Sequence, residues 1–130
     1  MPERKVLVVE DDDFLLEMYS TKLELEGFKV YNATSGMQGL KVAQRELPDL
    51  ILLDLNLPEM SGFEVLEHLK NGDTTKDISV VVLTNYSQKD HIDRCLDLGA
   101  DDYLIKAHFV PSEVISKIKK ILDEKETQNK

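Results

Sequence analysis

Short apolar runs alternate with segments of helical periodicity along this chain, and this alternation restricts the fold more than any other feature. Strands that are apolar throughout must be covered on both faces of their sheet, as in a parallel sheet between two layers of helices. The apolar runs predict five strands, near 5–9, 29–32, 50–53, 79–83 and 102–105. We therefore expect an α/β protein with a doubly wound, five-stranded parallel sheet.

Five helices are predicted to follow these strands, with their apolar residues recurring on one face. Their expected ranges are 13–26, 35–46, 61–71, 87–99 and 111–122. Ser61 and Glu64 have the spacing of a capping box at the start of the third helix, and Ser87 and Asp90 repeat it at the fourth. Helices on both faces of the sheet complete the predicted layers.

The last helix is expected to begin at Pro111, which suits a first helical turn, and to end near Leu122. No apolar residue follows Leu122, so the chain beyond it is expected to fray into solvent. The predicted organisation is one domain over residues 4–123 and a polar C-terminal tail over residues 124–130.

Composition and charge narrow the classes of partner. The formal net charge of −9 argues against direct binding of nucleic acid, because phosphate-binding surfaces need clustered Lys and Arg.

The first apolar run is too short for a signal peptide or a membrane span, and the single Cys95 suits a reducing compartment. His68, His91 and His108 lack metal-ligand spacing and are expected at the surface. We expect a cytoplasmic protein that contacts no membrane.

Polar side chains stand where four of the predicted strands end. Glu10 and Asp11 follow the first strand, Asp54 the third, Thr84 the fourth and Lys106 the fifth. The carboxyl ends of parallel strands meet at one edge of the sheet, where ligand sites gather, so we expect these side chains to converge. No glycine-rich phosphate loop follows the first strand, which argues against a nucleotide or flavin site.

Such an acidic cluster requires cations, because two carboxylates about 4 Å apart repel by on the order of 4 kcal/mol at an effective dielectric of about 20. Lys106 supplies one cation. Mg²⁺, a hard ion that takes few carboxylates and shares its shell with phosphate, is the natural second. With both beside it, Asp54 is a candidate nucleophile toward phosphorus, and Thr84 can donate its hydroxyl to a phosphoryl oxygen.

Each of these residues also has an ordinary structural explanation. An aspartate at a strand end is usually a turn former or a helix cap, and Asp12 and Asp13 are interpreted as caps of the first helix. A lone Thr or Lys at such a place is usually structural or solvated. The joint occurrence of suitable side chains at several strand ends favours an aspartyl-phosphate site.

Four segments carry a resemblance to a known family. They read VLVVED at residues 6–11, DLILLDLNLP at 49–58, VLT at 82–84 and GADDYLIK at 99–106. In order and spacing they resemble the response regulator receiver domain of two-component signalling, of the chemotaxis-regulator-like kind, over about residues 4–123. The resemblance implies a flavodoxin-like sheet with strand order 2-1-3-4-5.

The resemblance also implies roles for the acidic residues. Asp54 would accept a phosphoryl group from the phosphohistidine of a histidine kinase, or from a small donor such as acetyl phosphate. Asp11 and Asp54 would bind Mg²⁺ directly, Asn56 would contribute its backbone carbonyl, and Glu10 would act through water. The domain would then catalyse only its own phosphorylation and dephosphorylation.

A conformational switch is implied as well. Thr84 and Lys106 would sense the phosphoryl group, and Tyr103 would turn inward as Thr84 moves toward it. The surface expected to change comprises the fourth helix, the last strand and the last helix, where a downstream effector would dock. Dimerisation on phosphorylation stays open.

The chain departs from the family at the residue after Lys106. Here this residue is Ala107, whereas the family usually has a proline in a cis peptide bond. A cis bond before alanine would cost about 2.5 to 4 kcal/mol. We therefore predict strain or a reshaped loop at Lys106–Ala107, with Pro111 restarting the chain as a helix.

A second departure follows Thr84. Asn85 stands where the family prefers a small residue, and Tyr86 comes next. Together with Asn56, these side chains are expected to flank the path of the water that hydrolyses the acyl phosphate. We predict that Tyr86→Ala changes the rate of autodephosphorylation more than it changes metal affinity.

Two other functions remain open at this level. The chain can be the receiver part of a larger DNA-binding or hybrid-kinase regulator. It can instead be a dehalogenase-like phosphatase, which also phosphorylates an aspartate at a strand end. Such enzymes carry a second aspartate two residues after the nucleophile, where this chain has Asn56, so any turnover should be slow.

Overall fold

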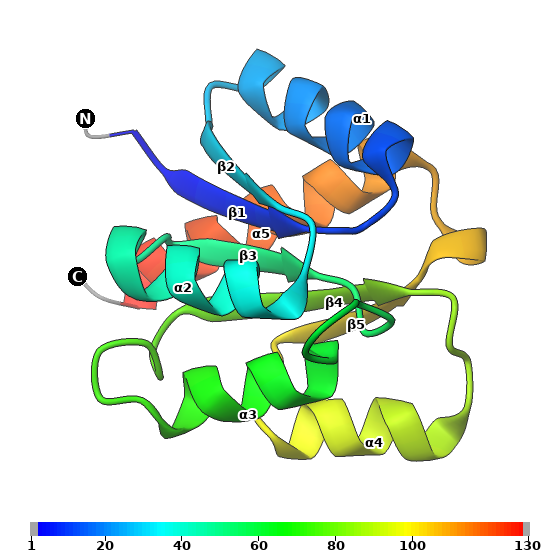
Figure 1. Cartoon of the computed structure of the whole chain (residues 1–130). Coiled ribbons are helices and arrows are strands. Elements are labelled where there is room, and N and C mark those ends of the chain that lie inside the picture. Colours follow the sequence, from blue (N-terminus) through cyan, green and yellow to red (C-terminus); the bar gives the residue numbers. More distant parts are fainter. Residues whose placement is uncertain (1–2, 129–130) are drawn as a thin grey trace.

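The computed structural model describes residues 3–128, in which five strands alternate with five α-helices (Figure 1). The strands are β1 (Lys5–Val9), β2 (Lys29–Ala33), β3 (Leu50–Leu53), β4 (Ser79–Thr84) and β5 (Asp102–Ile105). The helices are α1 (Asp13–Leu25), α2 (Gly36–Glu46), α3 (Gly62–Asn71), α4 (Lys89–Asp97) and α5 (Pro111–Gln128), with a short 3₁₀ helix, η1 (Lys106–His108), before α5. All the predicted strands and helices are present.

The strands form one parallel sheet in the order β2-β1-β3-β4-β5. This confirms the doubly wound, flavodoxin-like arrangement. Helices α1 and α5 cover one face of the sheet, and α2, α3 and α4 cover the other (Figure 1). The strand order reverses at β1 and β3, and in open α/β sheets ligands bind beyond the carboxyl ends of the strands at that point.

The centre of the sheet is apolar because both of its faces are covered. Every residue of β3 and β4 is buried, as is every residue of β1 except Lys5. Cys95 of α4 lies in one of the two apolar layers with no exposed surface, and burial raises the pKa of its thiol to about 11. Cys95 therefore stays neutral and acts as an apolar packing residue.

Local signals explain where several helices begin and end. The side chain of Asp12 caps α1 by accepting a hydrogen bond from the Leu15 amide at 3.0 Å. Ser61 caps α3 by accepting one from the Glu64 amide at 3.3 Å, as the capping box predicts. Gly27, with a φ of +93°, follows α1 in the left-handed conformation that glycine adopts without strain.

The predicted start of the fourth helix at Ser87 is wrong. Helix α4 begins at Lys89, and its N-cap, Gln88, makes no side-chain capping bond. The physical reason lies in the preceding loop, where the backbone of Tyr86 bonds to Thr84 and Tyr103 and is not available to a helix.

The predicted fraying after Leu122 is also wrong over the described residues. Helix α5 continues to Gln128, and residues 129–130 lie outside the described part of the chain. The polar residues of this last stretch are good helix formers, and two of them pair with the residue that precedes β1: Arg4 lies 2.8 Å from both Asp123 and Glu126. Within residues 3–128 no helix, α5 included, is long and apolar enough to cross a membrane.

The peptide bond between Lys106 and Ala107 is trans, so the strain predicted there is absent. The predicted reshaping of the loop is present as η1, and α5 begins at Pro111 as expected. A single 3₁₀ turn redirects the chain without a cis bond. Lys106 itself still points toward the carboxylates at the edge of the sheet.

Candidate functional site

The polar residues predicted to converge do so at the carboxyl edge of the sheet. Glu10 and Asp11 come directly after β1, and Asp54 directly follows β3. Thr84 is the last residue of β4, and Lys106 follows β5. Parallel pairing of β1, β3, β4 and β5 in register brings their ends together, although the residues are far apart in sequence.

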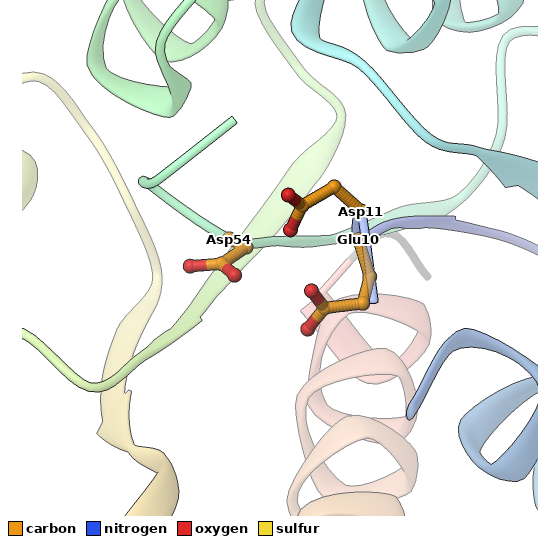
Figure 2. A group of neighbouring side chains, drawn as sticks. All are labelled: Glu10, Asp11 and Asp54. Carbon is orange, nitrogen blue, oxygen red and sulfur yellow. The ribbon is translucent and has the colours of Figure 1, made fainter. Parts of the chain in front are cut away.

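Three carboxylates form the centre of the site. Figure 2 shows Glu10, Asp11 and Asp54 gathered where β1 and β3 end. One oxygen of each lies within 4.8 Å of the others. Glu10 and Asp54 are only 4% and 6% exposed, while Asp11 is open to solvent. The group therefore combines two buried carboxylates with one carboxylate that is exposed to solvent.

Lys106 bridges the two buried acids. Its Nζ lies 2.6 Å from Glu10 Oε1 and 3.0 Å from Asp54 Oδ2. Burial alone would lower the pKa of Lys106, but hydrogen bonding to Glu10 and the charge of Asp54 outweigh burial, so its pKa is raised. Lys106 is thus held as an ammonium group between two carboxylates.

The pKa of Glu10 is also raised, in spite of this lysine. Burial is the main cause, and the charge of Asp54 adds to it. The hydrogen bond from Lys106 and the one from the Asp12 amide, at 3.1 Å, act in the opposite direction without cancelling the rise. Three carboxylates surround one ammonium group here, so negative charge is in excess at this site, and a further cation would relieve it.

Backbone groups hold Asp54 in place. Its Oδ1 accepts hydrogen bonds from the amides of Leu55, at 2.7 Å, and Asn56, at 3.4 Å. Gly62 packs against the same turn so closely that a Cβ there would lie 2.2 Å from the Asp54 carbonyl oxygen. The sequence gives no sign of this contact, because a close approach of two backbones leaves no local pattern.

A surface cavity of about 210 Å³ opens over Asp54. It is lined by Glu10, Asp11, Asp12, Leu15, Asp54, Asn56, Thr84, Asn85, Tyr86 and Lys106. All the predicted acidic residues, together with Thr84, Asn56 and Lys106, thus surround one space that is large enough for a phosphoryl group and several waters. Tyr103 does not line this cavity.

Tyr103 is connected to the site through Tyr86. The Tyr103 hydroxyl donates a 2.7 Å hydrogen bond to the Tyr86 carbonyl, and the Tyr86 amide donates to Thr84 Oγ1 at 3.4 Å. Burial raises the pKa of Tyr103 to about 12, so its hydroxyl remains a donor at neutral pH. The expectation from sequence concerned the side chain of Tyr86, whereas it is the backbone of Tyr86 that joins Thr84 to Tyr103.

One histidine is not where it was predicted to lie. His68 and His108 are exposed, but His91 is half-buried against the rings of Phe63 and Tyr86, with centroids 5.2 Å away in both cases. The apolar spacing of α4 gave no sign of this contact, because both partners come from other elements.

The donors at the site suit a hard divalent cation. Within the described residues, Glu10, Asp11 and Asp54 are the one group of three or more His, Cys, Asp or Glu side chains whose ligand atoms could meet at an ion. All three offer oxygen, the donor that Mg²⁺ and Ca²⁺ prefer, and two are buried in an excess of negative charge. These residues therefore fit a metal ion of this class.

Comparisons with known proteins agree with this geometry. The chain is 40% identical over 119 residues to the phosphate regulon transcriptional regulatory protein PhoB of Escherichia coli (strain K12), covering 92% of this chain and 52% of PhoB. It is 36% identical over 118 residues to the DNA-binding dual master transcriptional regulator RpaA of Synechocystis, covering 91% of this chain and 48% of RpaA. The chain spans about half the length of these curated relatives.

The same comparison holds for three-dimensional structure. The CheY-like response regulator receiver domain protein from Methanospirillum hungatei JF-1 matches with a TM-score of 0.91 at 31% identity, over 98% of this chain and 99% of that chain. The sequence pattern of the response regulator receiver domain matches residues 6–119. Agreement of sequence over this range and of fold over nearly the whole chain shows that this protein belongs to the response regulator receiver domain family.

Proposed function

We propose that Asp54 is the phosphoacceptor of this receiver domain and that it takes a phosphoryl group from a histidine kinase or a small donor in the presence of Mg²⁺. The observation that carries the proposal is the placement of Lys106, whose ammonium group lies 3.0 Å from Asp54 at the cavity beside the acidic cluster. A buried aspartate with a fixed cation and an open face is suited to nucleophilic attack on phosphorus.

The transfer is a substitution at phosphorus. One carboxylate oxygen of Asp54 forms the new bond as the bond from phosphorus to the donor nitrogen or oxygen breaks, and the leaving group keeps the electron pair. Lys106 offsets the charge on the phosphoryl oxygens, and Thr84 donates its hydroxyl to one of them. A loss of either side chain weakens this stabilisation.

The metal ion has a defined place in the proposal. Asp11 and Asp54 would hold Mg²⁺ directly with the Asn56 backbone carbonyl, and Glu10 would act through water. The ion supplies positive charge that brings an anionic donor and an anionic acceptor together. The gathering of three carboxylates around a single ammonium group supports this assignment.

The output of phosphorylation is a change of conformation. We infer that movement of Thr84 toward the phosphoryl group breaks its bond with the Tyr86 amide and thereby moves the acceptor of the Tyr103 hydroxyl. The surface of α4, β5 and α5 would carry this change to an effector protein. Taking such an equilibrium from 1:99 to 99:1 requires about 5.5 kcal/mol of differential interaction.

The partners are proposed by class. A histidine kinase is the expected phosphodonor. PhoB and RpaA are transcriptional regulators by name, and this chain corresponds to about half of each, so an output through a DNA-binding domain fits its relatives. The domain would act as a signalling module that turns over only its own phosphoryl group, in the cytoplasm where such kinases deliver it.

The test is direct labelling of the protein. Wild-type chain incubated with Mg²⁺ and acetyl phosphate is expected to gain the mass of one phosphoryl group, with the acid stability and base lability of an acyl phosphate. Asp54→Asn should gain none, whereas Asp97→Asn, a change of an exposed aspartate on α4, should label like the wild type. Labelling of Asp54→Asn to the wild-type extent would contradict the proposal.

The same preparation separates signalling from phosphatase activity. A receiver domain is expected to release about one phosphate per acceptor site in each cycle and to hydrolyse unrelated phosphomonoesters no faster than buffer does. Asn56 in place of a second aspartate supports this expectation. Repeated fast turnover of a phosphomonoester that depends on Asp54 would favour the dehalogenase-like alternative.

A further inference from the structure

Three aromatic rings from different elements meet beside the cavity. His91 of α4 packs against Phe63 of α3 and against Tyr86 of the β4–α4 loop, with centroid distances of 5.2 Å and interplanar angles of 58° and 47°. Arg94, one turn further along α4, lies over the Phe63 ring at 4.4 Å. We call Phe63, His91 and Tyr86 the aromatic stack.

The His91 ring packs against two other rings, and its Nδ1 atom makes no polar contact. This nitrogen is buried and has no hydrogen-bond partner. A buried polar atom without a partner costs free energy, so nothing about the contact requires an imidazole. A phenyl ring of similar shape would maintain the same tilted ring contacts and remove the unpartnered nitrogen.

Tyr86 is the residue through which the β4–α4 loop takes part in these ring contacts. Asn85, Ser87 and Gln88 are exposed, and Tyr86 is the one half-buried residue between Thr84 and α4. Tyr86 also lines the cavity over Asp54, and its backbone bonds to Thr84 and Tyr103. The backbone of Tyr86 is thus fixed by hydrogen bonds, and its ring contacts the ring of His91.

We infer that His91 is a positioning residue for dephosphorylation: by packing on Tyr86 it holds that side chain over the cavity and limits the entry of water. This inference rests on the proposed function of Asp54. In the step concerned, a water oxygen forms a bond to phosphorus while the bond from phosphorus to the Asp54 oxygen breaks. The electron pair returns to the carboxylate, and the proton of the water leaves to solvent.

The first test compares side chains at position 91. Each variant is labelled with acetyl phosphate and Mg²⁺, the donor is removed, and loss of the phosphoryl group is followed by intact mass. His91→Ala and His91→Leu are expected to lose it about two- to tenfold faster than wild type, the size that follows from one aromatic contact. His91→Phe should restore the wild-type rate. The matched control His68→Ala, on the exposed face of α3, should leave it unchanged.

Two results at position 91 would overturn the inference. One is a wild-type rate in His91→Ala and His91→Leu, and the other is an equal acceleration in His91→Phe. Leucine retains apolar volume without a ring, so it provides the comparison if alanine unfolds the chain. Failure of the wild type to label at all would instead contradict the proposed function, and the two failures are therefore distinguishable.

The second test asks whether His91 acts through Tyr86. Tyr86→Ala alone is expected to accelerate loss of the phosphoryl group, and adding His91→Ala to it should have no further effect, because the side chain being positioned is gone. Mg²⁺ affinity should stay at its wild-type value in all of these variants. Additive acceleration in the double variant would show that His91 acts by another route and would refute the inference.

Discussion

Lys106 shows how much of this site depends on single side chains. Its ammonium group is shared by Glu10 and Asp54, and all three side chains are largely buried, with Lys106 13% exposed. Removing one partner of a buried charge cluster leaves the others uncompensated, which is costlier than removing a pair on the surface. The residue types and their strand-end positions were foreseeable from sequence, whereas sharing of one ammonium between two acids depended on the packing.

Lys106→Met is expected to destabilise the metal-free protein by about 3 kcal/mol or more at neutral pH, because two buried carboxylates lose their cation. Because the pKa of Glu10 is already above its ordinary value of 4.5 in the folded chain, its protonation favours folding, and that contribution is lost as the pH rises through the folded pKa. The difference in free energy of unfolding between wild type and Lys106→Met should therefore become smaller as the pH falls. Urea unfolding of both proteins at several pH values measures this difference.

Lys119→Met provides the matched control for this change. Lys119 lies 2.8 Å from Glu26, but both side chains are nearly half exposed, so its loss should cost less than about 1 kcal/mol. Equal costs for the two substitutions would contradict the view that the Lys106 cluster is energetically buried.

At the scale of elements, most residues of the candidate site follow directly after strands, and two element boundaries differ from those that the sequence pattern predicts. The start of α4 was misplaced because Tyr86 is retained in the loop by bonds to Thr84 and Tyr103. Helix α5 was predicted too short because its last residues are polar, although Arg4 of the N-terminal segment binds Asp123 and Glu126 there. The bond from Tyr103 to Tyr86 and the ion pairs of Arg4 both join elements that are separated in sequence.

The close approach of Gly62 to the β3–α3 turn leads to a prediction about this element. Gly62→Ala would place a Cβ 2.2 Å from the Asp54 carbonyl oxygen and 2.6 Å from the Leu55 Cα, and neither is a flexible side chain that can move aside. We expect a loss of about 1 to 3 kcal/mol in stability and a lower yield of phosphorylation, because the turn that presents Asp54 must shift. Urea unfolding and intact mass after labelling measure the two effects.

Gly39→Ala in α2 is the control for Gly62→Ala. A Cβ at Gly39 would lie 2.9 and 3.0 Å from the two methyl groups of Val9, and no atom of Asp54 is among its three nearest contacts. Gly39→Ala should lower the free energy of unfolding less than Gly62→Ala does, and Asp54 should still be phosphorylated to the wild-type extent. If Gly62→Ala labelled as fully as Gly39→Ala, the turn would be more tolerant than its geometry indicates.

For the whole molecule, stability and ion binding are linked. The chain carries a net charge of −9, and three of its carboxylates lie within 4.8 Å of one another at one edge of the sheet. A cation that binds there stabilises the folded state alone, since the unfolded chain separates these residues. Binding therefore raises the free energy of unfolding of the entire domain.

Mg²⁺ is expected to raise the thermal midpoint of unfolding, with a gain of about 2.7 kcal/mol when the free ion is at a hundredfold excess over its Kd. Asp11→Asn should abolish this gain and make the metal-free protein more stable than wild type, because it removes one of three mutually repelling charges. Calorimetry with and without MgCl₂, against NaCl of equal ionic strength, measures both effects. An equal gain in wild type and Asp11→Asn would place the ion elsewhere.

Alternation of apolar runs with helical periodicity, and the polar residues at the strand ends, were enough to predict the five-stranded sheet, its helices and the meeting of Glu10, Asp11, Asp54, Thr84 and Lys106. These features follow from local patterns, because burial of a strand and the shared edge of a parallel sheet are properties that every such chain must satisfy.

Other features of the fold and of the site could be seen only in the folded chain. The trans bond after Lys106 and the bonds of the Tyr86 backbone lie outside the strands and α-helices, where no periodicity applies. The extension of α5 and the packing of His91 on Phe63 lie in helices but depend on contacts with other elements. Their conformations are set by partners contributed from other strands and helices, and those partners come within reach only after the sheet and its layers have formed.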